Sequence, residues 1–172
     1  RRMMPMYSRV KGGGRQFTEV IPELWMDLGG TRVKVSIYES PLPGTKVPVY
    51  FVRCPPLYDR PSLYGNSPDE HLRFAVLNWA ALKLCQYLRF APDVIHCNDW
   101  QTSLIPLLLR ARFSWDKLFA NTRTVLTIHN LGHQGTFPSN IMRETGLQDS
   151  WYLFHQDELN AGRLGFLMTG LL

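Results

Sequence analysis

The sequence predicts an α/β fold in which helices cover a parallel sheet. Two runs indicate buried parallel strands, because residues 93–100 and 124–130 each pass from an apolar, β-branched stretch into ionisable and amide side chains. A segment of helix length, residues 101–112, lies between them and completes a strand–helix–strand unit. Ligands of open α/β sheets bind beyond the carboxyl ends of the strands. The polar residues that end both runs are therefore expected to share one rim of the sheet and are candidates for a functional site.

The other elements follow from local patterns. Apolar and polar residues alternate over residues 32–38, and residues 47–52 are rich in Val, Tyr and Phe, with Pro43-Gly44 between the two stretches. These patterns predict two adjacent strands joined by a turn. Weaker signals predict a short strand at 2–4, a short helix at 140–145, and a helix or strand from 157 onward.

The longest predicted helix runs from Ser67 to about residue 89. Ser67 is a good N-cap, Pro68 suits the first turn, and Glu70 completes a capping box. On a helical wheel Asn78 falls in a polar sector, opposite a broad apolar face that we expect to pack on the sheet. Arg73 lies outside the polar sector, so its side chain either extends along the apolar surface to solvent or makes a specific buried pair.

Composition bounds the class of protein. A chain of 172 residues with 45% hydrophobic content fits one domain. The net charge of +5 comes from scattered Lys and Arg residues, which favours a phosphorylated small molecule over nucleic acid as partner. The three cysteines have no metal-like or redox-like spacing, and no apolar run is long enough to cross a bilayer. We therefore expect a cytoplasmic protein that binds neither nucleic acid nor membrane.

Polar residues at the ends of the two strands are the candidate site. His129 closes an apolar strand and is followed by Asn130, whose amide both donates and accepts hydrogen bonds, so the two can grip a polyhydroxylated ligand. Asp99 either caps the following helix or belongs to the same site. His96 fits a hydrogen-bonded structural histidine better than a reacting group. A metal site that also uses His133 is an alternative, which the glycines of this loop disfavour.

A turn-rich loop with two tyrosines precedes the long helix. Aromatic faces in such loops can stack on sugar rings, so Tyr64 is a candidate wall of a sugar site, although each tyrosine alone also fits a structural role. Trp100, directly after Asp99, is expected to be a packing anchor that fixes the direction of the carboxylate.

The motifs resemble one known family over nearly the whole chain. In order they are Leu57-Tyr58, Tyr64-Gly65-Asn66, Arg73-Phe74, His96-Cys97-Asn98-Asp99-Trp100-Gln101 and Thr127-Ile128-His129-Asn130-Leu131-Gly132-His133-Gln134-Gly135. Together they resemble the bacterial glycogen synthases and plant starch synthases. The resemblance implies a Rossmann-like sheet with helices on both faces, the N-terminal half of a two-domain GT-B glycosyltransferase. Residues 1–172 would be part of that domain, truncated at both ends, with the C-terminal nucleotide-binding domain absent.

The resemblance also implies an activity. The family transfers glucose from ADP-glucose, sometimes UDP-glucose, to the non-reducing end of an α-1,4-glucan such as glycogen or a maltooligosaccharide, with retention at the anomeric carbon. The nucleotide sugar is a substrate, and neither a metal nor a cofactor is required. The chain alone is expected to be inactive, and its location to be the cytoplasm, or the plastid if it comes from a plant.

Carried over residue by residue, the resemblance makes His129 and Asp99 catalytic. His129 would lie beside the transferred glucose, and Asp99 would orient the donor sugar or the acceptor hydroxyl. It implies substrate contacts at four further positions: Asn130, Tyr64, Gln134 and Gly135.

Two departures and two alternatives stand beside this interpretation. The family's Lys-Thr-Gly-Gly-Leu loop is upstream of the chain, and we predict that the run at 11–14 is a plain loop. Gly132-His133 replaces the Ala-Tyr or Gly-Tyr that relatives often carry. One alternative is a non-catalytic carbohydrate-binding domain of the same fold, and the other is a metal hydrolase that uses His96, Asp99, His129 and His133.

Overall fold

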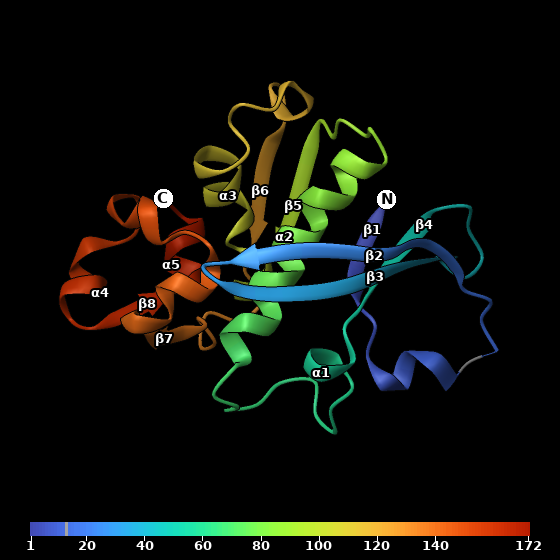
Figure 1. The fold of residues 1–172 in the computed structure, drawn as a ribbon, viewed down its shortest axis with the longest axis horizontal. Coiled ribbons are helices and arrows are strands. Elements are labelled where there is room, and N and C mark those ends of the chain that lie inside the picture. The colour runs from blue at the N-terminus through green and yellow to red at the C-terminus, as the bar shows by residue number, and fades with distance from the viewer. Residues whose placement is uncertain (13) are drawn as a thin grey trace.

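The computed structural model describes residues 1–12 and 14–172. At one end of the molecule a four-stranded sheet has the order β1-β4-β3-β2 (Figure 1). Its strands are β1 (Arg2–Pro5), β2 (Thr18–Leu28), β3 (Thr31–Pro41) and β4 (Pro48–Arg53). β1 runs parallel to β4, whereas β2, β3 and β4 are successively antiparallel. The predicted strand at 2–4 and the predicted pair at 32–38 and 47–52 are confirmed.

Strand β2 has no counterpart in the sequence-based prediction. Its residues alternate between exposed and buried only in the C-terminal half, and register shifts interrupt the pairing on both sides of Ile21. Pro22 lies at this irregularity, and proline inside a run argues against a strand. The regular pairing of residues 24–28 with residues 31–35 decides the conformation instead, and the two strands form a long ribbon that crosses in front of α2 (Figure 1).

The predicted strand–helix–strand unit is present. β5 (Val94–Asn98) and β6 (Arg123–Thr127) pair in parallel, with α3 (Ile105–Ala111) between them in sequence. Pro106 lies in the first turn of α3, where a missing N–H costs nothing. The strands are less buried than predicted, since Val94 is 54% and Val125 48% exposed. An apolar run shows which side chains a strand could bury, and the neighbouring segments decide how many of them are buried.

Helix α2 (Glu70–Tyr87) is the central element, and other parts of the chain surround its first half. Asn78, which the helical wheel places in the polar sector, is fully buried. The predicted capping box is wrong. Asp69 occupies the N-cap position without a side-chain cap bond, and the Glu70 carboxylate pairs with Arg73 instead. Of the two readings of Arg73, the structure has the buried pair.

Short elements complete the chain. They are α1 (Pro55–Tyr58), α4 (Gln156–Asn160), α5 (Phe166–Gly170), β7 (Thr136–Pro138), β8 (Arg163–Gly165) and the 3₁₀ helices η1 (Ser8–Gly12), η2 (Trp100–Thr102), η3 (Lys117–Phe119), η4 (Ser139–Thr145) and η5 (Gln148–Leu153). The predicted helix at 140–145 is thus a 3₁₀ helix, and α4 covers the start of the segment from 157. The run predicted as a loop begins inside η1, and Gly13 lies outside the described residues.

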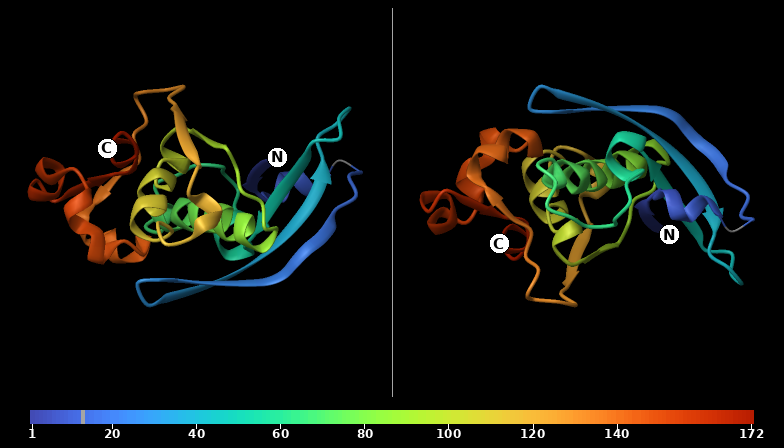
Figure 2. Two further views of the ribbon diagram at one scale, coloured as in Figure 1. Left: turned by 90° about the horizontal axis from the view of Figure 1, so that it is seen from above. Right: turned by 90° about the horizontal axis from the view of Figure 1, so that it is seen from below.

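The elements gather at two ends of the molecule, and α2 lies between them. Seen from above and below, the four-stranded sheet lies at one end and the C-terminal elements at the other (Figure 2). The tip of the β2–β3 ribbon reaches the far end, where the Arg143 Nε donates to the Gly29 carbonyl at 2.6 Å. Among the described helices, none combines the length and the apolar character that a membrane span requires.

A cavity of about 600 Å³ lies between the four-stranded sheet and the β5–β6 pair. Its walls include residues of β1 and β5, and its floor is the apolar side of α2, with Leu77, Ala81 and Leu84. In the described part of the chain, β1 and β5 belong to separate sheets. The cavity therefore lies between β1 and β5, which are edge strands of their respective sheets.

Candidate functional site

The carboxyl ends of β5 and β6 meet, and they bring Asp99 and His129 together. The Asp99 N–H donates to the Thr127 carbonyl at 2.8 Å, which extends the pairing of the two strands by one residue. The Asp99 Oδ1 accepts the backbone N–H of His129 at 2.6 Å. The prediction that these residues share one rim is confirmed, while their chemical roles stay predictions.

Asp99 adopts a backbone conformation that glycine favours, with φ +56° and ψ −172°. Such a conformation costs on the order of 1–3 kcal/mol and persists only where the surroundings hold it in place. Its N–H and its carboxylate are both bonded to the end of β6. The helix-cap interpretation is wrong, because the Asp99 side chain makes no cap bond to η2.

The His129 imidazole is exposed, and its Nε2 lies 3.0 Å from the Asn98 Oδ1. Asn98 also lines the cavity between the sheets, so this contact holds the ring on the β5 side of the rim. His96, two residues earlier, is hydrogen-bonded through Nε2 to the Thr127 Oγ1 at 2.7 Å, as its structural interpretation predicts.

A second cavity, of about 780 Å³, opens next to this rim. Its lining comes from the loop at 64–66, from Glu70 at the start of α2, from Asp99 with the start of η2, and from residues 130–137. Five of the six predicted site residues line this cavity: Asp99, Asn130, Tyr64, Gln134 and Gly135. The sixth, His129, contributes its backbone to the rim but is not among the lining residues.

Tyr64 forms an open aromatic wall of the cavity. Its side chain is 59% exposed, and its ring stacks on Phe74 with centroids 6.4 Å apart and planes at 29°. Phe74 is fully packed in the core and belongs to α2. One face of the Tyr64 ring is thus supported from behind, as a stacking surface for a ligand requires.

The loop at 130–137 is shaped by its own amides. The Asn130 Oδ1 accepts the Gly132 N–H at 2.9 Å, and the Gln134 Nε2 donates to the Leu131 carbonyl at 3.2 Å. Gly135 has φ +62°, and a Cβ there would lie 2.3 Å from a ring carbon of Trp100. Only glycine allows the loop to pass this close to the indole.

Trp100 is the packing anchor that the sequence predicts. It is 7% exposed and meets Phe74 edge to face at 4.7 Å between ring centroids. Phe137 and Phe166 also pack against it, with ring centroids 5.7 and 6.1 Å away. These contacts fix the chain directly after Asp99, so the strained conformation of that residue rests on a rigid support.

Glu70 also lines the cavity, although sequence reasoning assigned it to a capping box. It is 4% exposed and its Oε2 lies 2.7 Å from the Arg73 Nη1. The i, i+3 spacing of the two charges was the available signal. Cys97 is adjacent to the site in sequence, but burial raises the pKa of its thiol to about 12, so it is no nucleophile at neutral pH.

The residues proposed for the metal alternative do not form a ligand set. The imidazoles of His96 and His129 contact Thr127 and Asn98, and His133 lies in the loop that lines the cavity. Across residues 1–12 and 14–172, no three His, Cys, Asp or Glu side chains gather in a way that could hold a metal ion.

Comparison with known proteins places the chain in a family. The model of the starch synthase catalytic domain family matches residues 1–172. Glycogen synthase 2 of Geobacter metallireducens is 36% identical over 174 residues, covering 98% of the chain and 35% of the relative. The glycogen synthase of Aeromonas hydrophila is 41% identical over 141 residues, covering 78% of the chain and 28% of the relative. The chain thus spans about a third of the length of these relatives.

A solved structure confirms the predicted GT-B fold. The catalytic domain of Starch Synthase IV from Arabidopsis thaliana, bound to ADP and acarbose, superposes with a TM-score of 0.80. The two sequences are 24% identical, and the match covers 98% of the chain and 35% of the plant protein. With the fold, the motifs and the family match in agreement, the chain belongs to the starch synthase catalytic domain family.

Proposed function

We propose that the chain is part of a retaining glucosyltransferase that moves glucose from ADP-glucose, or UDP-glucose, to the non-reducing end of an α-1,4-glucan. The observation that carries this proposal is the bond between the Asp99 carboxylate and the His129 N–H, at the edge of a cavity lined by Tyr64 and two amides. Membership of the starch synthase family supports the choice of reaction. The ADP and acarbose bound to the Arabidopsis protein support a nucleotide and an oligosaccharide as ligand classes.

The geometry suits a reaction in which positive charge develops at the anomeric carbon. Oxygen atoms held in fixed positions stabilise such charge best, because they need no reorganisation during the step. Asp99 is held in this way by its backbone and side-chain bonds, and it fixes the end of β6 where the His129 carbonyl and imidazole lie. We propose that His129 contacts the transferred glucose and that Asp99 orients the sugar or the acceptor hydroxyl.

The lining of the cavity supplies the remaining contacts. Asn130 and Gln134 carry amides that can bond sugar hydroxyls, and Gly135 lets a ligand approach the backbone. The supported face of Tyr64 offers a stacking surface for a sugar ring. The scheme uses no metal and no cofactor. We propose the cytoplasm as the location, or the plastid for a plant protein.

Because the chain spans about a third of its relatives, we propose that it supplies one side of the cleft and is inactive alone. The diphosphate would then be received by residues outside the chain. Incorporation of labelled glucose from ADP-glucose into glycogen measures this directly. Turnover by the isolated chain would contradict the proposal.

Replacement of His129 tests the assignment in the full-length enzyme. We expect His129→Ala to lower kcat by at least about 10²-fold, the loss typical of one electrostatic contact made in the transition state. His96→Ala is the matched control, since that imidazole bonds to Thr127 on the same pair of strands. An unchanged rate for His129→Ala would remove His129 from the mechanism. Glucan binding without any transfer in the wild type would favour a non-catalytic carbohydrate-binding domain.

A further inference from the structure

A buried ion pair lies at the start of α2, directly beside the proposed sugar cavity. Glu70 and Arg73 are 4% and 1% exposed, and the Glu70 Oε2 is 2.7 Å from the Arg73 Nη1. Glu70 lines the cavity, whereas Arg73 lies behind it. The proposed mechanism gives neither residue a role.

The pair holds both ends of the loop that carries Tyr64. The Arg73 Nε donates to the Leu57 carbonyl at 2.8 Å, and the Tyr58 hydroxyl donates to the Arg73 carbonyl at 2.7 Å. At the other end, the Glu70 Oε1 accepts the Gly65 N–H at 3.3 Å. Tyr64 precedes that anchored amide, so the pair fixes where its ring stands in the cavity wall.

Stability alone gives a poor reason for this pair. Replacing a buried ion pair with well-packed apolar residues is often neutral or stabilising, because desolvation of the charges offsets their attraction. The pair is also incomplete, since the buried Arg73 Nη2 has no hydrogen-bond partner in the described structure. Its ordered contacts go to the loop, which indicates a role in the geometry of the cavity.

The chemistry of the cavity indicates which ligand depends on this wall. Two carboxylates, Glu70 and Asp99, line it, and no lysine or arginine is among the lining residues that the structure describes. A diphosphate would find no cationic side chain among these lining residues, whereas neutral sugar hydroxyls find carboxylate and amide partners. The open aromatic face of Tyr64 adds a stacking surface. The ligand that fits is the glucan chain, not the nucleotide.

We propose that Glu70 and Arg73 are positioning residues that anchor the Tyr64 loop and thereby set the affinity for the glucan acceptor. This inference rests on the proposed function. It separates acceptor binding from the chemical step, which depends on the rim at Asp99 and His129.

The test uses the full-length protein with a maltooligosaccharide as acceptor. We expect Glu70→Ala to raise the acceptor KM about tenfold, the effect of a weakened contact worth roughly 1.4 kcal/mol, while kcat and the KM for the nucleotide sugar change less than about twofold. Glu70→Gln keeps an acceptor for the Gly65 N–H and is expected to stay closer to the wild type. The control is Asp149→Asn, which removes the charge from an ion pair with Arg112 that belongs neither to the Tyr64 loop nor to the cavity lining.

A double variant separates positioning from stability. Glu70→Leu with Arg73→Met replaces the pair with apolar side chains and is expected to recover the melting temperature but not the acceptor KM. Hydrogen exchange supplies a readout that needs no activity. The Gly65 amide is expected to exchange faster in Glu70→Ala and in the double variant, and at the wild-type rate in Asp149→Asn.

Two results would overturn the inference. One is a double variant that regains both stability and acceptor KM, which would make the pair structural. The other is unchanged protection of the Gly65 amide in Glu70→Ala. If the wild-type protein transfers no glucose, the proposed function fails, and the exchange experiment still decides whether the pair anchors the loop.

Discussion

Asp99 combines a strained backbone with two specific hydrogen bonds. Its φ of +56° belongs to a region where side chains with a Cβ are disfavoured, yet its N–H and carboxylate both bind the end of β6. Glycine would adopt this conformation more easily but would leave the His129 N–H without the carboxylate. The strain is therefore a cost of holding one oxygen beside one backbone amide.

Substitution of Asp99 separates stability from activity. In the full-length enzyme we expect Asp99→Gly to keep the free energy of unfolding within about 1 kcal/mol of the wild type, because relief of strain offsets the lost hydrogen bond. Glucose transfer is expected to fall at least about 10²-fold. Chemical denaturation and initial rates measure the two quantities. Asp99→Asn, which keeps an oxygen for the His129 N–H, serves as the control, and a fully active glycine variant would contradict the assignment.

At the scale of residues, sequence patterns locate the site better than they assign its members. The shared rim of Asp99 and His129 follows from parallel strands, whose carboxyl ends must meet at one edge. Glu70 is missed because its local pattern also fits a capping box. Local spacing cannot show which of two partners the Glu70 carboxylate binds, because the burial of Arg73 depends on segments that are distant in the sequence.

Helix α2 shows how an element departs from its helical wheel. Asn78 occupies a polar sector but is buried, and its Nδ2 donates to the carbonyls of Phe74 at 2.6 Å and of Gln101 at 2.8 Å. The second bond ties the helix to η2, directly after the strained Asp99. The wheel identifies the apolar face correctly but cannot show that other segments cover the polar sector.

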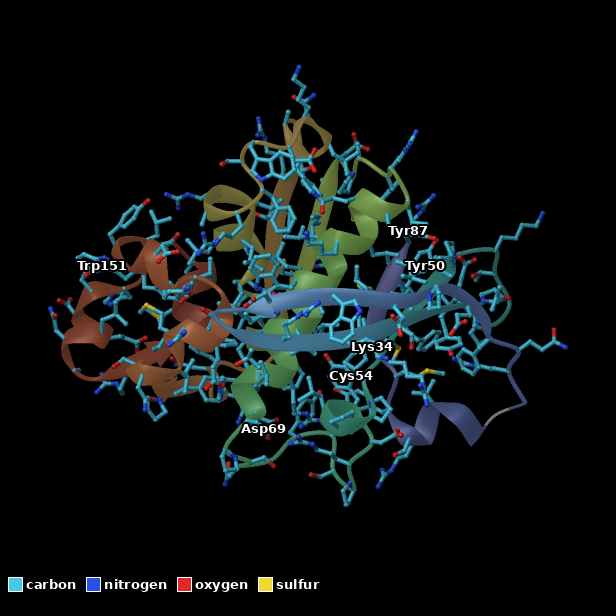
Figure 3. The ribbon with its side chains drawn as sticks, viewed as in Figure 1. Lys34, Tyr50, Cys54, Asp69, Tyr87 and Trp151 are labelled. Carbon is cyan, nitrogen blue, oxygen red and sulfur yellow. The ribbon has the colours of Figure 1, made fainter. Side chains whose placement is uncertain are left out.

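Replacement of Asn78 tests this tie between elements. We expect Asn78→Leu to lower the free energy of unfolding by about 1–3 kcal/mol, since two hydrogen bonds are lost in a buried environment. Tyr87→Ala near the exposed end of α2 is the comparison, with an effect within about 0.5 kcal/mol because that ring is 57% exposed (Figure 3). Urea denaturation measures both. Equal effects of the two changes would show that Asn78 contributes no specific tie.

Strand prediction succeeds where alternation is regular and fails where it is broken. β3 and β4 follow from their sequences, whereas β2 does not, because Pro22 and the register shifts around Ile21 interrupt its pattern. The ribbon forms because pairing with β3 supplies partners for the backbone of β2. Such pairing is a property of two segments together and is not encoded within either one.

For the whole molecule, buried thiols predict how stability changes with pH. Burial raises the pKa of Cys97 to about 12 and that of Cys85 to about 11, from an ordinary value of 9.0. A raised pKa in the folded state means that unfolding releases protons above the ordinary value. Stability is therefore unaffected by these thiols below about pH 9 and falls as the pH rises toward the folded values.

The Cys97→Ala variant tests the contribution of one thiol. We expect the free energy of unfolding to fall less steeply with pH above about pH 9 than in the wild type. The difference in slope is the contribution of about one proton released on unfolding. The variant is also expected to be less stable at neutral pH, because a buried side chain is shortened. Denaturation series at several alkaline pH values measure the slope. Parallel slopes for the two proteins would show that the Cys97 thiol is not protected in the folded state.

The fold class is readable from sequence because two apolar runs with polar ends are typical of parallel strands. The division of the strands into separate sheets cannot be read from the sequence, because it depends on which strand edges pair with one another. β1 pairs with β4, β5 pairs with β6, and the 600 Å³ cavity lies between the two groups. The sequence overestimates the burial of β5 and β6 for the same reason. Apolar side chains can be buried, but the neighbouring segments decide how many of them are covered.

The cavity between β1 and β5 has a practical consequence for handling the isolated chain. Edge strands carry rows of amide and carbonyl groups that readily bind a further extended polypeptide. The apolar floor formed by α2 would cover one face of that added strand. Copies of the chain at high concentration thus offer one another a template for intermolecular sheet growth. Dilute samples, with light scattering recorded at each concentration, keep the properties of single molecules apart from those of aggregates.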